Sequence, residues 1–108
     1  MKFSFLERPQ FTKNLTKLID DDSYFELQNF LLENSDWGDV IPRLPYSIRK
    51  IRWRIKGRGK RGGVRVVYFL AKGDDYNIFL DIWAKNEKQD LTQDEYKTLC
   101  EFLAEIGL

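Results

Sequence analysis

Basic residues are concentrated in the middle of this 108-residue chain. Residues 40 to 73 hold eleven of its eighteen lysines and arginines and none of its seventeen acidic residues, although the formal net charge is only +1. The rest of the chain therefore carries seven basic and seventeen acidic residues, a balance of −10. A basic segment of this kind predicts a polyanion partner such as nucleic acid.

The cations alternate with apolar residues between positions 49 and 56, which is the period of a β-strand. One face of this predicted strand carries Ile51, Trp53 and Ile55, and the other carries Lys50, Arg52, Arg54 and Lys56. Alternate side chains of a strand lie about 6.6 to 6.8 Å apart, close to the phosphate spacing of an extended nucleic-acid chain. The pattern favours a surface that follows a nucleic-acid backbone, and an ordinary solvated edge is the alternative.

The sequence "GRGKRGGV" at 57 to 64 contains a G-x-G-x-x-G-x-V pattern. A dinucleotide site needs this pattern before a helix, and a P-loop needs Ser or Thr after its lysine. Here a strand-like run follows, and the other kinase motifs are missing. The glycines are read as a hairpin connection with positive φ angles. The crowded cations Lys56, Arg58, Lys60 and Arg61 favour an external anion over simple solvation.

Residue types that often carry out chemistry are scarce. The chain has no histidine and one cysteine, Cys100. This composition excludes an internal disulfide, a cysteine metal cluster and the usual Ser-His and Cys-His pairs. The acidic run at 20 to 22 is read as a turn between helices and not as a divalent-ion site. We expect no metal or cofactor, so any reaction must use carboxylates, tyrosine, lysine or arginine.

The cations are expected to lie on one small α+β domain spanning residues 1–108. The patterns predict a strand at 2–7, helices at 9–19 and 23–33, strands at 49–56, 64–71 and 76–84, and a helix after Thr92. Capping boxes are expected at Ser23 with Glu26 and at Thr92 with Glu95. The fold class is a curved antiparallel β-sheet with two N-terminal helices and a C-terminal helix packed on its apolar face.

Two aromatic residues of the predicted strands are candidates for stacking on an RNA base. Trp53 shares a face with Ile51 and Ile55, which favours a place in the core, and both roles stay open for Tyr68. The sequence shows no run of about 18 apolar residues and no apolar signal segment near Met1. We therefore expect a cytoplasmic protein without a membrane partner.

The run "IRKIRWRIKGRGKRGGVRVVYFL" at 48 to 70 and the run "FLDIWAKNEKQDLTQDE" at 79 to 95 resemble the RelE/HigB superfamily of type II toxin–antitoxin toxins, in particular its HigB-like branch. The "GDVIP" at 38 to 42 belongs to the same resemblance. The resemblance implies an mRNA interferase, a metal-independent endoribonuclease that enters the ribosomal A site beside the small-subunit rRNA and cuts translated mRNA. It also implies a cognate helix-turn-helix antitoxin, through which alone the toxin reaches operator DNA.

The resemblance also implies site residues. It places functional cations on "RWRIKGRGKR", an important arginine at Arg65, and further polar or basic groups in "AKNEK". Trp83 stands where the family frequently has tyrosine, so no phenolic acid or base is assigned there. The residues expected to bind RNA are Lys50, Arg52, Arg54, Arg58, Lys60, Arg61, Asn86 and Lys88.

Cleavage of RNA without metal needs an aligned 2′-OH, stabilisation of the charged transition state, and proton transfer. Arg65 is expected to stabilise the charge, because its planar fork can hold phosphate oxygens bidentately. A lysine crowded by other cations has a lowered pKa, which favours proton transfer. Lys56 is the first candidate for that role, followed by Lys60 and Lys85.

Two other functions fit the same residues. The first alternative is a non-catalytic RNA- or ribosome-binding module that uses the same basic face. The second is a subunit with a toxin fold whose remaining role is complex formation and operator binding with an antitoxin.

Overall fold

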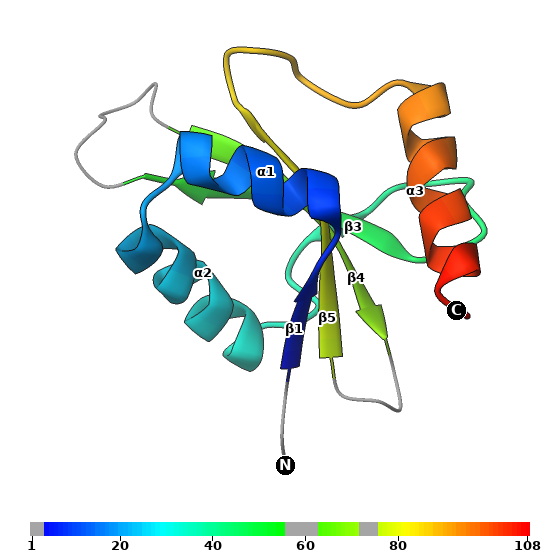
Figure 1. Cartoon of the computed structure of the whole chain (residues 1–108), viewed down its shortest axis with the longest axis horizontal. Coiled ribbons are helices and arrows are strands. Elements are labelled where there is room, and N and C mark those ends of the chain that lie inside the picture. Colours follow the sequence, from blue (N-terminus) through cyan, green and yellow to red (C-terminus); the bar gives the residue numbers. More distant parts are fainter. Residues whose placement is uncertain (1–3, 56–62, 72–75) are drawn as a thin grey trace.

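A computed structural model describes residues 4–55, 63–71 and 76–108 of the chain (Figure 1). Its elements are β1 (Ser4–Glu7), α1 (Pro9–Leu18), α2 (Asp21–Glu33), β2 (Asp39–Val40), β3 (Ile48–Arg54), β4 (Gly63–Ala71), β5 (Tyr76–Ala84) and α3 (Gln93–Glu105). Most of the glycine pattern, residues 57 to 62, lies outside these ranges. Among the described residues, no helix has the length and apolar character needed to span a bilayer.

The five strands form an open sheet in the order β1-β5-β4-β3-β2. β3, β4 and β5 form the expected antiparallel meander, and the short β2 extends it next to β3. β1 pairs in parallel with β5, so the sheet is mixed and not wholly antiparallel. A parallel neighbour needs a long crossover connection, and the chain between β1 and β5 provides one.

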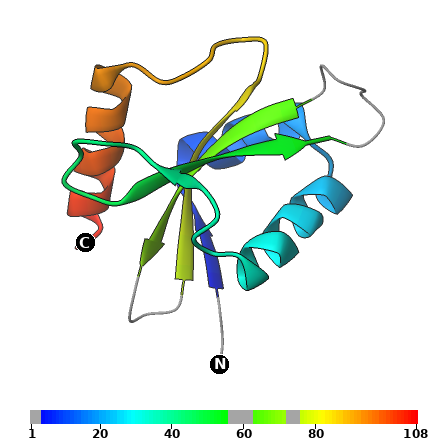
Figure 2. The same cartoon turned by 180° about the vertical axis from the view of Figure 1, so that it is seen from behind.

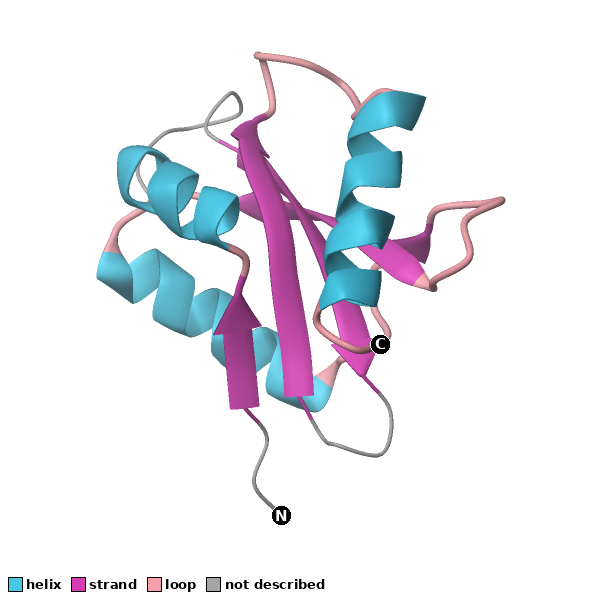
Figure 3. Cartoon of the chain, turned by 45° about the vertical axis from the view of Figure 1, so that its right-hand side comes forward, coloured by secondary structure: helices cyan, strands magenta, loops and turns pink. Residues whose placement is uncertain are grey.

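Helices cover both faces of the sheet (Figure 3). α1 and α2 lie on one face, where a core cluster joins Phe11, Leu15, Leu27, Leu31, Val66, Tyr68 and Phe79. α3 lies on the other face, where a second cluster joins Val67, Ile78, Leu80, Trp83, Leu99 and Leu103. The sequence prediction placed all helices on one apolar face, and this detail is wrong. β4 and β5 are apolar on both sides, as strands covered on both faces must be.

The two long helices α2 and α3 begin with different caps. α3 has the predicted capping box, in which the Thr92 hydroxyl accepts from the Glu95 N–H at 3.1 Å and the Glu95 carboxylate accepts from the Thr92 N–H at 3.0 Å. The predicted box at Ser23 is wrong, because Asp20 is the cap and its carboxylate accepts from the Ser23 N–H at 2.8 Å. The acidic run therefore caps and begins α2 and favours its dipole, as an acidic turn between helices should.

The ladder between β4 and β5 contains a β-bulge, at which β5 has one residue more than β4. Val67 pairs with Asp81, but the next residue, Tyr68, pairs with Phe79, so Leu80 has no partner across the ladder. This β-bulge changes which side chains of β5 face each layer of helices. After the bulge, Trp83 is paired with Arg65.

Candidate nucleic-acid interface

The alternation predicted for β3 is present in the structure. Ile51 is buried in the cluster below α1 and α2, and Trp53 packs against that cluster. Arg52 and Arg54 are exposed, and Lys50 is half-buried. The strand period thus separates an apolar face from a cationic one. The predicted site residues Lys56, Arg58, Lys60 and Arg61 lie outside the described residues.

Arg65 lies beside Arg52 across the ladder between β4 and β3. It is the one charged residue that is buried in the described part of the chain, with 8% of its surface exposed. Burial lowers the pKa of the Arg65 guanidinium, and the neighbouring Arg52 lowers it further, whereas Asp90 acts in the opposite direction. Like charges on directly paired strand positions destabilise a sheet. An anion bound between the two guanidinium groups would relieve this repulsion.

A hollow of about 310 Å³ opens next to these paired arginines. Its lining consists of Arg52, Trp53, Arg54, Gly63, Val64, Arg65 and Lys85. Lys85 is held there by the end of β5, since its backbone N–H donates to the Gly63 carbonyl at 3.0 Å. Four of the cations predicted from the sequence therefore line one site. We call this the arginine hollow.

No pattern in the sequence predicts a carboxylate on this face, but the structure shows one. The Asp90 carboxylate lies 3.3 Å from the Lys50 ammonium and accepts a short hydrogen bond from the Tyr96 hydroxyl. Burial alone would raise the pKa of Asp90, but hydrogen bonds from Tyr96, Leu91 and Lys50 together hold it below its usual value. Burial and the nearby Asp90 carboxylate raise the pKa of Tyr96 above its usual value. Lys50 is thus already paired, whereas no ion pair within the described ranges involves a cation of the arginine hollow.

Asn86 and Lys88 belong to the chain segment after β5. Asn86 is exposed in the turn that follows the strand. The Lys88 ammonium lies 3.1 Å from the Glu95 carboxylate and 5.5 Å from the centre of the Trp83 ring. Lys88 lines a different hollow from Lys85. The structure therefore brings Arg52, Arg54, Arg65 and Lys85 together but leaves Lys88 apart from them.

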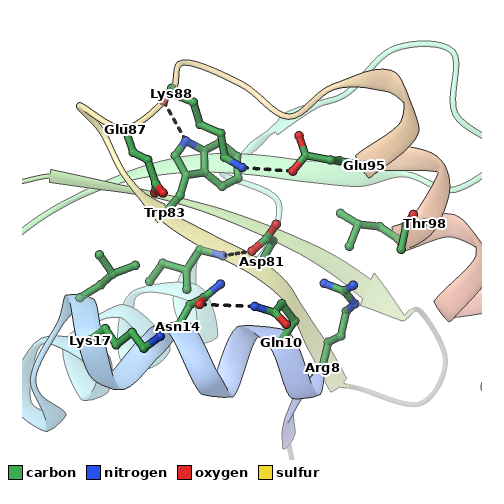
Figure 4. Close-up of a pocket in the computed structure, with 13 residues that line it drawn as sticks. Arg8, Gln10, Asn14, Lys17, Asp81, Trp83, Glu87, Lys88, Glu95 and Thr98 are labelled. Atoms are coloured by element: carbon green, nitrogen blue, oxygen red, sulfur yellow. Dashed lines mark hydrogen bonds and ion pairs between the residues drawn. The ribbon is translucent and has the colours of Figure 1, made fainter.

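The hollow beside Lys88 has about 500 Å³ and lies between α1 and α3, over β5 (Figure 4). Arg8, Lys17 and Lys88 are among its lining residues, as are the carboxylates of Asp81, Glu87 and Glu95. Burial raises the pKa of Asp81, although the Ile82 N–H, Arg8 and Lys88 act against this. Because charges of both signs line this hollow, it matches a polyanion less well than the arginine hollow does.

The stacking candidates have different environments. Tyr68 is fully buried, and its hydroxyl accepts from the Gly38 N–H at 2.9 Å and donates to the Ser35 carbonyl at 3.0 Å. A stacking role for Tyr68 is therefore wrong, because no base can reach its ring. Trp53 packs against the core, as its position on β3 predicted.

The order and pairing of the elements define the fold class of the protein. Its three helices around an open five-stranded sheet form the RelE-like α+β fold, and the resemblance expected from the sequence is confirmed at the level of the fold. A solved structure of the E. coli toxin RelE, a double arginine-to-alanine mutant in the free state, superimposes with a TM-score of 0.58. It is 13% identical in sequence, and the match covers 95% of this chain and 99% of that one. No family model matches the sequence.

Proposed function

We propose that this protein is the toxin of a type II toxin–antitoxin system and cuts translated mRNA on the ribosome. The observation that carries the proposal is the arginine hollow, where Arg52, Arg54, Arg65 and Lys85 converge on a RelE-like fold. The guanidinium groups of Arg52 and Arg65, which stand on directly paired strand positions, suit the phosphate at which an RNA strand is cut.

In the proposed reaction, Arg65 stabilises the negative charge that develops on the phosphate. Its place in a central strand and its burial fix the guanidinium before RNA arrives, so little reorganisation is needed. Lys85 borders the same hollow and is the described candidate for proton transfer, with Lys56 as the other. The ribosome would hold the mRNA in line for attack, and the reaction would need no metal.

The test of this proposal compares translated and free RNA as substrates. Wild-type protein should cut mRNA on programmed ribosomes and leave the same RNA almost intact when it is free. Arg65→Ala should lower the cleavage rate about 100-fold or more, in the range seen when one charge-stabilising donor is lost. Arg65→Lys, which keeps the charge without the fork, should retain part of the rate. Lys13→Ala on α1 is the control and should cut normally, while equal cutting of free and translated RNA would rule out ribosome dependence.

A non-catalytic clamp on RNA or the ribosome is the second candidate. It is favoured by the chemistry of the arginine hollow, whose described lining contains cations and apolar groups but no carboxylate. The clamp predicts that wild-type protein binds programmed ribosomes and never cuts the mRNA. The cleavage assay therefore separates the two functions.

The proposed toxin would act in the cytoplasm and be neutralised by a helix-turn-helix antitoxin. It would meet operator DNA only within that complex, and a subunit kept for complex formation alone would share this property. The neighbouring reading frame should therefore encode a small helix-turn-helix protein. Co-expression of the two should relieve any growth inhibition.

A further inference from the structure

A second hollow adjoins the arginine hollow at the outer edge of the sheet. It has about 550 Å³ and is lined by Trp37, Gly38, Asp39, Lys50, Ile51 and Arg52. Arg52 lines both hollows, so they are neighbours along β3. We call this second site the tryptophan hollow. β2 pairs only with Arg49 and Lys50, so this hollow lies at the start of β2, where β3 continues past its short neighbour.

Trp37 has an exposed ring and belongs to neither core cluster. With 66% of its surface exposed, it is the most exposed large hydrophobic residue in the described part of the chain. Its only described ring contact is with Phe30, at a centroid distance of 5.7 Å and an interplanar angle of 86°. Because Trp37 is 66% exposed and its described ring contact is edge-to-face, indole surface remains available to a planar ligand.

The loop that carries Trp37 is held by hydrogen bonds with the buried Tyr68 and the half-buried Arg49. The Gly38 N–H donates to the Tyr68 hydroxyl, and that hydroxyl donates to the Ser35 carbonyl. The Arg49 guanidinium donates to the carbonyls of Asp36 at 2.9 Å and Gly38 at 2.7 Å. A β-carbon at Gly38 would lie 2.9 Å from the Tyr68 hydroxyl, so only glycine fits this close approach. Trp37 is thus presented by a fixed loop, which lowers the cost of ordering a stacked ligand.

The charges of the tryptophan hollow suit a nucleotide better than a phosphate alone. Arg52 can hold a phosphate at the side shared with the arginine hollow. Asp39 disfavours a phosphate deep in the tryptophan hollow, but its carboxylate can accept a hydrogen bond from an exocyclic amino group of a base. An aromatic face beside a cation is the usual arrangement for a single-stranded base and its backbone.

We propose that the tryptophan hollow binds one unpaired base of the RNA strand whose backbone lies in the arginine hollow. The base stacks on Trp37, and Asp39 favours bases with an exocyclic amino group over uracil. This inference rests on the proposed RNA-binding function and adds a site that selects the base next to the phosphate held by Arg52.

The test measures binding of three labelled hexaribonucleotides by fluorescence anisotropy at low salt. The ligands are oligo(C), oligo(U) and an abasic hexamer with the same number of phosphates. Trp37→Ala should weaken oligo(C) binding about tenfold, which is within the contribution of one base–aromatic stack, and should leave abasic binding unchanged. Trp37→Phe should restore most of the affinity, and Asp39→Asn should reduce the preference for oligo(C) over oligo(U).

Phe25→Ala provides the matched control. Phe25 lies on α2 and has 63% of its surface exposed. The substitution therefore removes a similarly exposed ring that lies away from the hollow. It should leave the affinity for all three ligands unchanged. Because Trp37 contributes little to the core, melting curves of its variants should match the wild type.

The outcomes separate this inference from the function on which it rests. If Arg52→Ala weakens RNA binding but Trp37→Ala does not, the base site is wrong and the RNA-binding function stands. Equal losses for the abasic and base-bearing ligands would also overturn the base site. If the wild type binds none of the hexamers and no programmed ribosomes, both proposals fail, and the exposed ring is better explained as a protein contact.

Discussion

Arg65 and Asp90 show how single residues set the electrostatics of the cationic face. Arg65 is covered by the fold and lies beside Arg52, and the described lining of its hollow contains no carboxylate. Asp90 instead pairs with Lys50 and accepts from Tyr96. The face therefore has two parts. In the neutralised part Asp90 pairs with Lys50, and in the open part the described lining of the arginine hollow has no carboxylate. An RNA phosphate would gain more from the open part.

The neutralised part gives a pH-dependent prediction for Asp90→Asn. The pKa of Asp90 is lower in the folded protein than in the unfolded chain, where it is about 3.9. Its carboxylate therefore stabilises the protein at pH values above about 3.9, and this stabilisation is lost as the pH falls through the pKa of the folded state. The variant should be less stable by about 0.5 kcal/mol at pH 7, because the ion pair is half exposed. The difference should shrink between pH 5 and pH 3 in urea unfolding experiments.

Glu101→Gln serves as the control for that series. Glu101 is exposed on α3, and its substitution should change stability little at any pH. A stability difference for Asp90→Asn that stays constant from pH 7 to pH 3 would contradict the role given to its charge.

At the scale of elements, the strand period predicted the faces of β3 correctly. Ile51 and Trp53 lie on the core side and Arg52 and Arg54 on the cationic side, because a period of two leaves one choice once the apolar face is known. The parallel pairing of β1 and the place of α3 on the opposite face could not be predicted. Both depend on contacts between segments far apart in the chain, for which local patterns hold no information.

The same limit applied within the candidate site. Arg52, Arg54, Arg65 and Lys85, which line the arginine hollow, were predicted as site residues because their residue type and position carry the signal. Asp90 was missed, since nothing near it in the sequence points to Lys50, forty residues earlier. The cap of α2 was placed three residues late because both Asp20 and Ser23 are good N-cap residues.

The loop between α2 and β2 supplies a prediction about stability. Tyr68→Phe removes the hydroxyl that accepts from the buried Gly38 N–H. The unpaired N–H should cost about 1 to 3 kcal/mol in the free energy of unfolding. Tyr46→Phe is the matched control, because its hydroxyl donates to the Leu108 carbonyl at a half-exposed site where water can replace it. Equal stability of Tyr68→Phe and wild type in urea titrations would show that the Tyr68 hydroxyl does not hold the loop in place.

Over the whole molecule, charge is distributed unevenly in spite of the small net charge. The cationic face of β3 and β4 carries the arginine hollow, whereas all seventeen acidic residues lie outside the basic stretch at 40 to 73. Figure 2 shows the sheet from behind, with β3 and β4 crossing the middle of the molecule between α2 and α3. A central cationic surface with acidic surroundings would guide a polyanion to one place and disfavour binding elsewhere.

This distribution predicts a strong salt dependence of RNA binding. Four cations in the arginine hollow should give a log–log slope of about −3 or steeper, at about −0.7 per neutralised phosphate of a single strand. Arg54→Ala should reduce the slope by about 0.7, and Lys13→Ala on α1 should leave it unchanged. Anisotropy titrations between 50 and 200 mM salt measure these slopes, and a slope near zero would exclude a phosphate-binding surface.

The bulge at Leu80 determines which side of the sheet each later side chain of β5 faces. With the extra residue in place, Trp83 faces the same layer as Arg65, and Lys85 can reach the arginine hollow. Deletion of Leu80 would reverse the faces to which the side chains after it point. Lys85 would then lie on the opposite side of the sheet, and Trp83 would face the layer of α1 and α2. A one-residue deletion in the middle of a buried strand would thus dismantle the site without removing any of its cations.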